Sequence, residues 1–357
     1  MSNILGDVIN MNNTTAVLIA VGVSFIVTAV LGFVLIPLLH KLKFGQNILT
    51  DIGPRWHAKK QGTPTMGGLM FIIGIAVAVL VVALTGRFTA FSLFSENDVL
   101  AGQEKIKLYA GLLLALCLSF VGFTDDYIKV KRGRNLGLTE IQKTIPQVLI
   151  IAGYLTTMVM SNNTSMIIPL IGRVSLDSVP GIIFFYAFGA CVIYGTANAV
   201  NFTDGVDGLC GSVTVPVGVA FAVIGYLVSN TSASVLGACL AGACAGYLIW
   251  NHYPAKVMMG DTGSMFLGGL VAALAFSVNC PLILIPVGIV YVVEALSDIL
   301  QIASIKLRHK KIFRMSPIHH HFEMCGWNEK KIVAVFSVVS VAGAIVGIVL
   351  MCFSVVK

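Results

Sequence analysis

The sequence contains few charged residues. Asp, Glu, Lys and Arg make up 11% of its 357 residues, whereas soluble globular domains carry about 25%. Apolar side chains make up 57%, and so much apolar surface cannot be hidden from water with so few charges. The low polarity also excludes a disordered chain, and the lack of a strict short repeat excludes a coiled coil or a collagen. We therefore expect an all-α integral membrane protein, with residues 1–357 forming one polytopic membrane domain.

Paired cysteine motifs are absent as well. The eight Cys lie mostly in apolar stretches and form no CxxC pair, so neither a disulfide framework nor a zinc site is predicted. The polar segment 1–15 has no cationic region ahead of the first apolar run, which argues against a cleaved signal peptide.

Long uncharged stretches predict about ten transmembrane helices. A membrane helix needs about 20 mostly apolar residues. The ninth span is more polar, because it continues through Glu294, Asp298 and Gln301, and Pro286 and Gly288 are expected to kink it. The predicted spans are about Thr14–Leu39, Thr65–Gly86, Leu108–Phe123, Thr144–Met160, Pro180–Val200, two between Asp207 and Lys256 separated at 229–232, two after Thr262 separated at 279–281, and Ile332–Val356.

Lys and Arg are concentrated on one side of this predicted topology. Cytoplasmic loops carry an excess of these residues. With ten spans, this bias places both termini outside and the Lys- and Arg-rich loops in the cytoplasm. The predicted cytoplasmic loops, which hold 18 of the 23 Lys and Arg residues, are 40–64, 124–143, 201–208, 252–261 and 306–331.

Five Asp residues fall at or just past the predicted cytoplasmic ends of spans. They are Asp125, Asp126, Asp204, Asp207 and Asp261. Each one alone could simply cap a helix, but carboxylates that converge at a membrane edge need a cation or another partner. Mg²⁺ is usually held by a few carboxylates together with substrate phosphates. The sequence therefore predicts a cytoplasmic site for phosphorylated substrates and a divalent cation.

A run of three His residues, His319, His320 and His321, precedes Phe322-Glu323. Successive imidazoles project in different directions, so they are not expected to share one metal ion. As phosphate donors or proton carriers they suit neutral pH.

These motifs resemble those of the bacterial phospho-N-acetylmuramoyl-pentapeptide transferases, the MraY family, within the superfamily of polyprenyl-phosphate N-acetylhexosamine-1-phosphate transferases. The resemblance extends from about His57 to Lys331, and the triple His is its most specific mark. One departure is Met258, where the family commonly has Phe. The motifs that carry the resemblance lie at 60–68, 125–126, 198–208, 251–264 and 317–323.

The resemblance implies a Mg²⁺-dependent enzyme of the bacterial inner (plasma) membrane. It would transfer phospho-N-acetylmuramoyl-pentapeptide from its UDP carrier to undecaprenyl phosphate, releasing UMP and forming lipid I for peptidoglycan synthesis. The implied partners are these two substrates and membrane lipid, with a homodimer also considered and no nucleic acid expected.

The resemblance also assigns roles residue by residue. It implies that Asp261 is the Mg²⁺ ligand and that Asp125 and Asp126 are a catalytic pair, and His320 joins them as a catalytic residue. Direct attack by the lipid phosphate is favoured over a covalent intermediate on Asp. The implied substrate-binding residues are Lys60, Thr65, Lys129, Asn198, Asp204, Asp207, Gln301, His319 and His321.

Two other functions stay open at this point. One is a sister transferase that uses UDP-N-acetylglucosamine, because the Asp motifs alone fit the wider superfamily. The other is a cation-coupled secondary transporter with the Asp residues as its ion site. Transporters usually place such charges near the membrane midplane and in repeated halves, whereas these Asp residues lie at helix ends.

Overall fold

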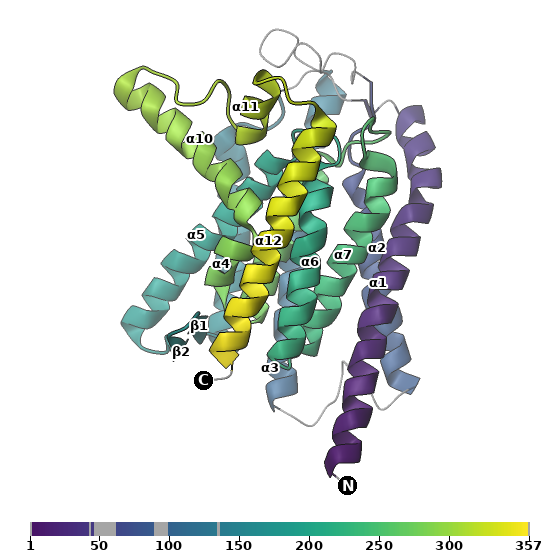
Figure 1. The fold of residues 1–357 in the computed structure, drawn as a ribbon, viewed down its shortest axis with the longest axis vertical. Helices are drawn as coiled ribbons and strands as arrows, with labels where there is room; N and C mark the ends of the chain where they lie inside the picture. Colours follow the sequence, from purple (N-terminus) through teal and green to yellow (C-terminus); the bar gives the residue numbers. More distant parts are fainter. Residues whose placement is uncertain (1, 43, 46–61, 89–98, 134–135, 356–357) are drawn as a thin grey trace.

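The computed structural model describes residues 2–42, 44–45, 62–88, 99–133 and 136–355. They form a bundle of long helices with one short β-hairpin (Figure 1). The elements are α1 (Ser2–Lys41), α2 (Gly68–Phe88), α3 (Val99–Arg132), α4 (Glu140–Met160), β1 (Met166–Ile168), β2 (Gly172–Val174), α5 (Val179–Thr203), α6 (Leu209–Leu227), α7 (Thr231–Asn251), α8 (Gly260–Ser277), the 3₁₀ helix η2 (Pro281–Ile283), α9 (Leu284–Val287), α10 (Ile289–Arg308), α11 (Ile318–Met324) and α12 (Glu329–Val355).

The helices have the length and composition of membrane spans, which confirms the predicted all-α membrane class. Eight helices in the described ranges are long and apolar enough to cross a bilayer, and α9 with α10 forms a ninth candidate bent by 89°. The 18-residue helix α8 is not among them, because its polar first turn lowers its mean hydropathy. Each predicted span falls on one of these eight helices, on α8 or on the bent pair.

Helix α8 forms the centre of the bundle. Its residues are buried continuously from Thr262 to Ser277, and it packs against α3, α5 and α2. A helix that is apolar all round is expected in the core of a large bundle. The first turn of α8 is thereby fixed by its neighbours, and that turn carries Asp261.

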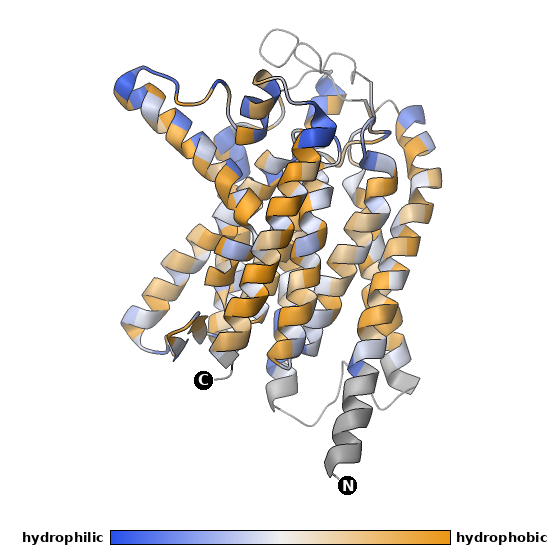
Figure 2. Ribbon diagram, in the orientation of Figure 1, coloured by the Kyte–Doolittle hydropathy of each residue, from blue (hydrophilic) through white to orange (hydrophobic). Residues whose placement is uncertain are grey.

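Polar and charged residues gather at one end of the bundle. Figure 2 shows apolar residues along the body of the helices and hydrophilic ones at the upper end, around α11 and the end of α10. The start of α1 and the end of α12 both lie at the opposite end (Figure 1). The two ends therefore differ as predicted, while their assignment to cytoplasm and exterior stays a prediction.

The predicted end of the third span differs from the structure. The predicted span Leu108–Phe123 ends before Asp125, whereas α3 continues to Arg132, so Asp125 and Asp126 lie within a helix. Helix α3 tolerates these charges because each carboxylate finds a partner on a neighbouring segment. The ninth span is broken at Gly288, which confirms the kink expected at Pro286 and Gly288.

Candidate active site

The adjacent residues Asp125 and Asp126 point to different partners. Both are buried, with 0% and 3% of their surfaces exposed. Successive residues of a helix project about 100° apart, so one turn of α3 can serve two segments. Asp125 accepts a hydrogen bond from the backbone N–H of Leu138 at 2.7 Å. Asp126 instead faces the beginning of α8.

Asp126 caps the first turn of α8. Its Oδ2 accepts hydrogen bonds from the backbone N–H and from the Oγ1 hydroxyl of Thr262, at 2.9 and 2.7 Å. Its Oδ1 accepts one from the backbone N–H of Asp261 at 3.2 Å. A negative charge at a helix N-terminus is stabilised by the free N–H groups and the helix dipole. Asp126 therefore positions the backbone that carries Asp261.

Asp261 lies among donors from three other helices. Its Oδ1 accepts a hydrogen bond from Asn201 Nδ2 of α5 at 3.0 Å. Its Oδ2 lies 3.2 Å from Lys129 Nζ of α3 and 2.6 Å from Lys143 Nζ of α4. The Asp261 side chain is 19% exposed, so it remains accessible to a ligand.

The same two lysines also bind Asp125. Lys129 Nζ and Lys143 Nζ lie 2.5 and 3.1 Å from Asp125 Oδ2. Each ammonium group therefore bridges the carboxylates of Asp125 and Asp261. Buried carboxylates require such compensation, because an unpaired charge is costly to remove from water.

The acidic cluster, defined as Asp125, Asp126 and Asp261, has the donor chemistry of a site for a hard cation. One carboxylate oxygen from each residue lies within 4.8 Å of the others. Oxygen-only ligation of this kind suits Mg²⁺. The cluster could therefore bind a metal ion.

The segment before α2 packs beside the acidic cluster. The backbone N–H groups of Gly67 and Gly68 donate to the carbonyls of Met258 and Met259, at 2.9 and 3.1 Å. Thr65 is buried, and its hydroxyl lies close to Gly260, which has a positive φ of 70°. A side chain at position 260 would collide with Thr65 and Asp126. Lys60 lies outside the described residues.

The three His residues form a second polar cluster at the same end. The His319 ring and the Glu294 carboxylate are fully buried, with His319 Nδ1 3.0 Å from Glu294 Oε2. His320 Nδ1 lies 2.6 Å from Glu323 Oε2. His321 Nδ1 accepts a hydrogen bond from a backbone N–H at 3.1 Å. The three rings therefore have three different partners.

Three of the remaining predicted site residues tie neighbouring segments together. Asn198 donates to Gln147 Oε1 at 3.0 Å, one turn before Asn201. Asp207 accepts a hydrogen bond from the Ala255 N–H at 2.9 Å, which ties the α5–α6 turn to the segment before α8. Gln301 accepts from two N–H groups of the α10–α11 loop, both at 3.0 Å. Asp204 ends α5 and is half-buried.

Sequence reasoning did not single out three residues that contact the acidic cluster, or Ser264, which contacts one of the three. Lys143 counted only as one of the Lys residues of a cytoplasmic loop. Asn201, Thr262 and Ser264 lie inside the recognised motifs, but only the structure shows Asn201 Nδ2 donating to Asp261 and, at 2.8 Å, to Ser264 Oγ. A polar residue three positions after Asn198 on a helix is a usable signal, because both then lie near one face.

Known proteins match this chain in sequence. The sequence model described as "Glycosyl transferase family 4" matches residues 108–279. Signature 1 of the phospho-N-acetylmuramoyl-pentapeptide-transferases matches residues 60–72.

Three relatives named "Phospho-N-acetylmuramoyl-pentapeptide-transferase" illustrate the similarity. The one from Clostridium perfringens (strain SM101 / Type A) is 45% identical over 329 residues, or 91% of this chain and 94% of the relative. The one from Clostridium botulinum (strain Eklund 17B / Type B) is 41% identical over 348 residues, covering 97% and 99%. The one from Desulforudis audaxviator (strain MP104C) is 42% identical over 341 residues, covering 93% and 97%.

Proposed function

Because the chain belongs to the phospho-N-acetylmuramoyl-pentapeptide-transferase family, we propose that it transfers phospho-N-acetylmuramoyl-pentapeptide from UDP to undecaprenyl phosphate, forming lipid I and UMP. The observation that carries this proposal is the meeting of Asp125, Asp126 and Asp261 at one end of a membrane bundle. A lipid acceptor stays in the bilayer while a nucleotide donor arrives from water, so the two can meet only at a membrane face.

Mg²⁺ is the cofactor that fits the acidic cluster. Asp261 and Asp125 are the residues that would hold it. Their carboxylates lie so close together that the ammonium groups of Lys129 and Lys143 each contact both of them. When bound, such an ion would supply positive charge that offsets the repulsion between the carboxylates and an anionic substrate and that would favour departure of UMP.

The protein's own side chains provide positioning and charge. Asp126 fixes the start of α8, and Asn201 orients the Asp261 carboxylate. Lys129 and Lys143 bring two positive charges to a site where both substrates are anions. A phosphate monoester has its second pKa near 6, so the lipid phosphate is largely deprotonated at pH 7 and can attack the sugar-linked phosphorus directly. Covalent capture of the phosphosugar on Asp125 is the alternative.

The His cluster is the second element of the proposed site. Glu294 fixes the ring orientation of His319, and Glu323 does the same for His320. Nδ1 of His320 is directed at Glu323, and an imidazole held in a fixed orientation can donate to a substrate phosphate or carry a proton.

An apolar groove suits the polyprenyl tail. The cavity of about 300 Å³ lies between α5 and the bent α9–α10 pair, at the break near Gly288. Its lining is almost entirely apolar and includes Val192, Gly195 and Ile285. The 89° bend keeps the two helical segments from closing on α5, which leaves room for a lipid chain leading toward the polar end.

Release of UMP tests the proposed reaction. Purified protein is supplied with UDP-MurNAc-pentapeptide and undecaprenyl phosphate, with Mg²⁺ or with EDTA. We expect Mg²⁺-dependent release that falls at least about 100-fold in Asp261→Asn, because each 1.36 kcal/mol lost from the transition state costs tenfold. The matched control is Glu140→Gln, an exposed carboxylate at the start of α4, which should keep parental activity. UMP release from UDP-N-acetylglucosamine instead would identify the sister transferase.

The groove is tested separately. Gly195 is exposed and lines the groove, and an added Cβ there would have no atom within 4 Å. Gly153 on α4 is the matched control, because it is also exposed and an added Cβ there would likewise have no atom within 4 Å. Gly195→Leu should raise KM for undecaprenyl phosphate while leaving KM for the nucleotide substrate unchanged. Gly153→Leu should leave both unchanged. Equal effects of the two substitutions on both KM values would contradict the assignment of the groove. Location in the inner membrane and a homodimer stay predictions.

A further inference from the structure

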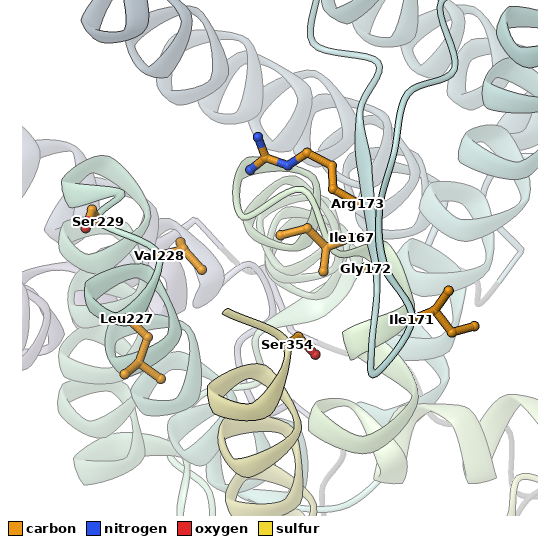
Figure 3. A pocket seen from close by; sticks show the side chains of 8 residues that line it. All are labelled: Ile167, Ile171, Gly172, Arg173, Leu227, Val228, Ser229 and Ser354. Atoms are coloured by element: carbon orange, nitrogen blue, oxygen red, sulfur yellow. The ribbon is translucent and has the colours of Figure 1, made fainter. Parts of the chain in front are cut away.

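A second cavity lies at the opposite end of the bundle from the acidic cluster. It has a volume of about 440 Å³ and lies between the β-hairpin, the end of α6 and the end of α12. Figure 3 shows Leu227 and Val228 on one side, Ile171 of the hairpin on the other, and Arg173 above. The lining residues are Ile167, Ile171, Gly172, Arg173, Leu227, Val228, Ser229 and Ser354.

Hydrogen bonds hold the walls of this cavity in place. The backbone N–H of Leu170, at the tip of the hairpin, donates to Ser354 Oγ of α12 at 3.1 Å. The N–H of Ile167 donates to the carbonyl of Asn279 at 2.6 Å. The hairpin is therefore fixed to α12 and to the turn after α8, and the cavity is a feature of the packed bundle.

The polar side of the cavity is positively charged. Arg173 is exposed and makes no ion pair within the part of the chain that the structure describes. It lies close enough to Lys107 for the two positive charges to interact, and Glu104 is the acidic group near Lys107. The Lys107 ammonium donates to Asn279 Oδ1 at 2.7 Å. The guanidinium of Arg173 is the cation available to an anion in the cavity.

The other side of the cavity is apolar and lies at a membrane boundary. Ile167, Ile171, Leu227 and Val228 line it. Helix α6 ends at Leu227, and α12 ends one residue after Ser354. A cation beside apolar side chains at the ends of spans matches a phospholipid, which has a phosphate next to its glycerol and acyl chains.

We propose that this cavity binds the headgroup of an anionic phospholipid from the leaflet at this end of the bundle. Arg173 donates to the phosphate oxygens, because a guanidinium can make two parallel, charge-assisted hydrogen bonds to a phosphate. Leu227, Val228 and Ile171 contact the glycerol and the first acyl carbons. This site is separate from the transfer reaction, since it lies at the other end of the helices.

Binding of phosphatidylglycerol tests the proposal. Purified full-length protein in detergent is titrated with this lipid, and native mass spectrometry measures the affinity for the first bound molecule. Arg173→Gln should weaken that affinity about tenfold, the size of one lost charge-assisted contact. Val228→Trp, which fills the cavity and keeps Arg173, should weaken it by a similar factor. Arg308→Gln removes an exposed Arg at the end of α10 and should change it less than twofold.

Three further arms decide the source and the charge of the ligand. Phosphatidylcholine and inorganic phosphate should each bind at least about tenfold more weakly than phosphatidylglycerol. Unchanged UMP release and melting temperature would show that Arg173→Gln and Val228→Trp fold normally. Equal phosphatidylglycerol affinity in the parent and both folded variants would overturn the proposal. Equal binding of phosphatidylcholine, or displacement of the lipid by inorganic phosphate, would overturn it too.

Discussion

Replacing Asp126 by Asn separates a positioning role from direct participation in catalysis. The carboxylate accepts three hydrogen bonds, two through Oδ2 from Thr262 and one through Oδ1 from the N–H of Asp261. An Asn side chain has one oxygen. If that oxygen keeps the two bonds to Thr262, its NH₂ group faces the N–H of Asp261 as donor against donor.

The expected cost follows from this geometry. A hydrogen bond to a charged acceptor contributes roughly 1.5–3 kcal/mol, so Asp126→Asn should lose about 10- to 100-fold in kcat and should also melt at a lower temperature. Thr262→Val removes only the 2.7 Å hydroxyl bond and should cost about 2- to 10-fold. Because both changes affect one set of bonds, the double variant should lose less than the product of the single losses.

The assay is UMP release across a range of pH, together with thermal unfolding in detergent, and Glu140→Gln is the control. A positioning residue leaves the shape of the pH profile unchanged. The reasoning is refuted if Asp126→Asn is as inactive as Asp261→Asn while its melting temperature equals that of the parent. Such a result would make Asp126 a ligand or a base.

Three other substitutions test neighbouring contacts. Lys143→Met removes a cation that lies 2.6 Å from Asp261 and should lower UMP release roughly 10- to 100-fold, with Lys143→Arg retaining more activity than Met. Glu294→Gln removes the charge beside the buried His319 ring and should lower kcat and move the pH profile, whereas an unchanged profile would deny His319 a titrating role. Lys107→Met leaves the Asn279 oxygen without its 2.7 Å donor and should cost about 1–3 kcal/mol of stability, measured as a lower melting temperature with UMP release retained below it.

Much of the architecture could be predicted because each membrane helix is a long, continuous run of apolar residues, which is visible in the sequence without any knowledge of contacts. Uncharged stretches locate every long helix, and the alternation of spans places Asp125 and Asp261 at the same end of the bundle. The extension of α3 to Arg132 could not be predicted, since it depends on partners that other segments offer to the two Asp side chains. The polar first turn of α8 likewise depends on a partner from another segment, because Asp126 of α3 accepts hydrogen bonds from its N–H groups.

Side-chain contacts were less predictable than helix ends. Asn198 and Asn201 are equally polar and lie one turn apart, yet only Asn201 donates to Asp261. Which of them does so depends on where α4 and α8 meet α5, since Asn198 donates to Gln147 of α4 instead, and composition does not record that packing. Lys143 is similar, because its sequence position gives no sign that its ammonium bridges Asp125 and Asp261.

The distance between α3 and α8 connects the packing of the bundle with the chemistry of the site. A Cβ at Gly122 would lie only 2.2 Å from the carbonyl oxygen of Asp261, so the two helices approach as closely as backbones allow. That contact brings the first turn of α8 within reach of the Asp126 carboxylate, one turn further along α3. Asp126 then supplies the acceptor that the first N–H groups of α8 lack within their own helix. Because its backbone is already held, the Asp261 side chain can contact Asn201, the two lysines and a ligand. A site built in this way needs both the glycine and the buried acid.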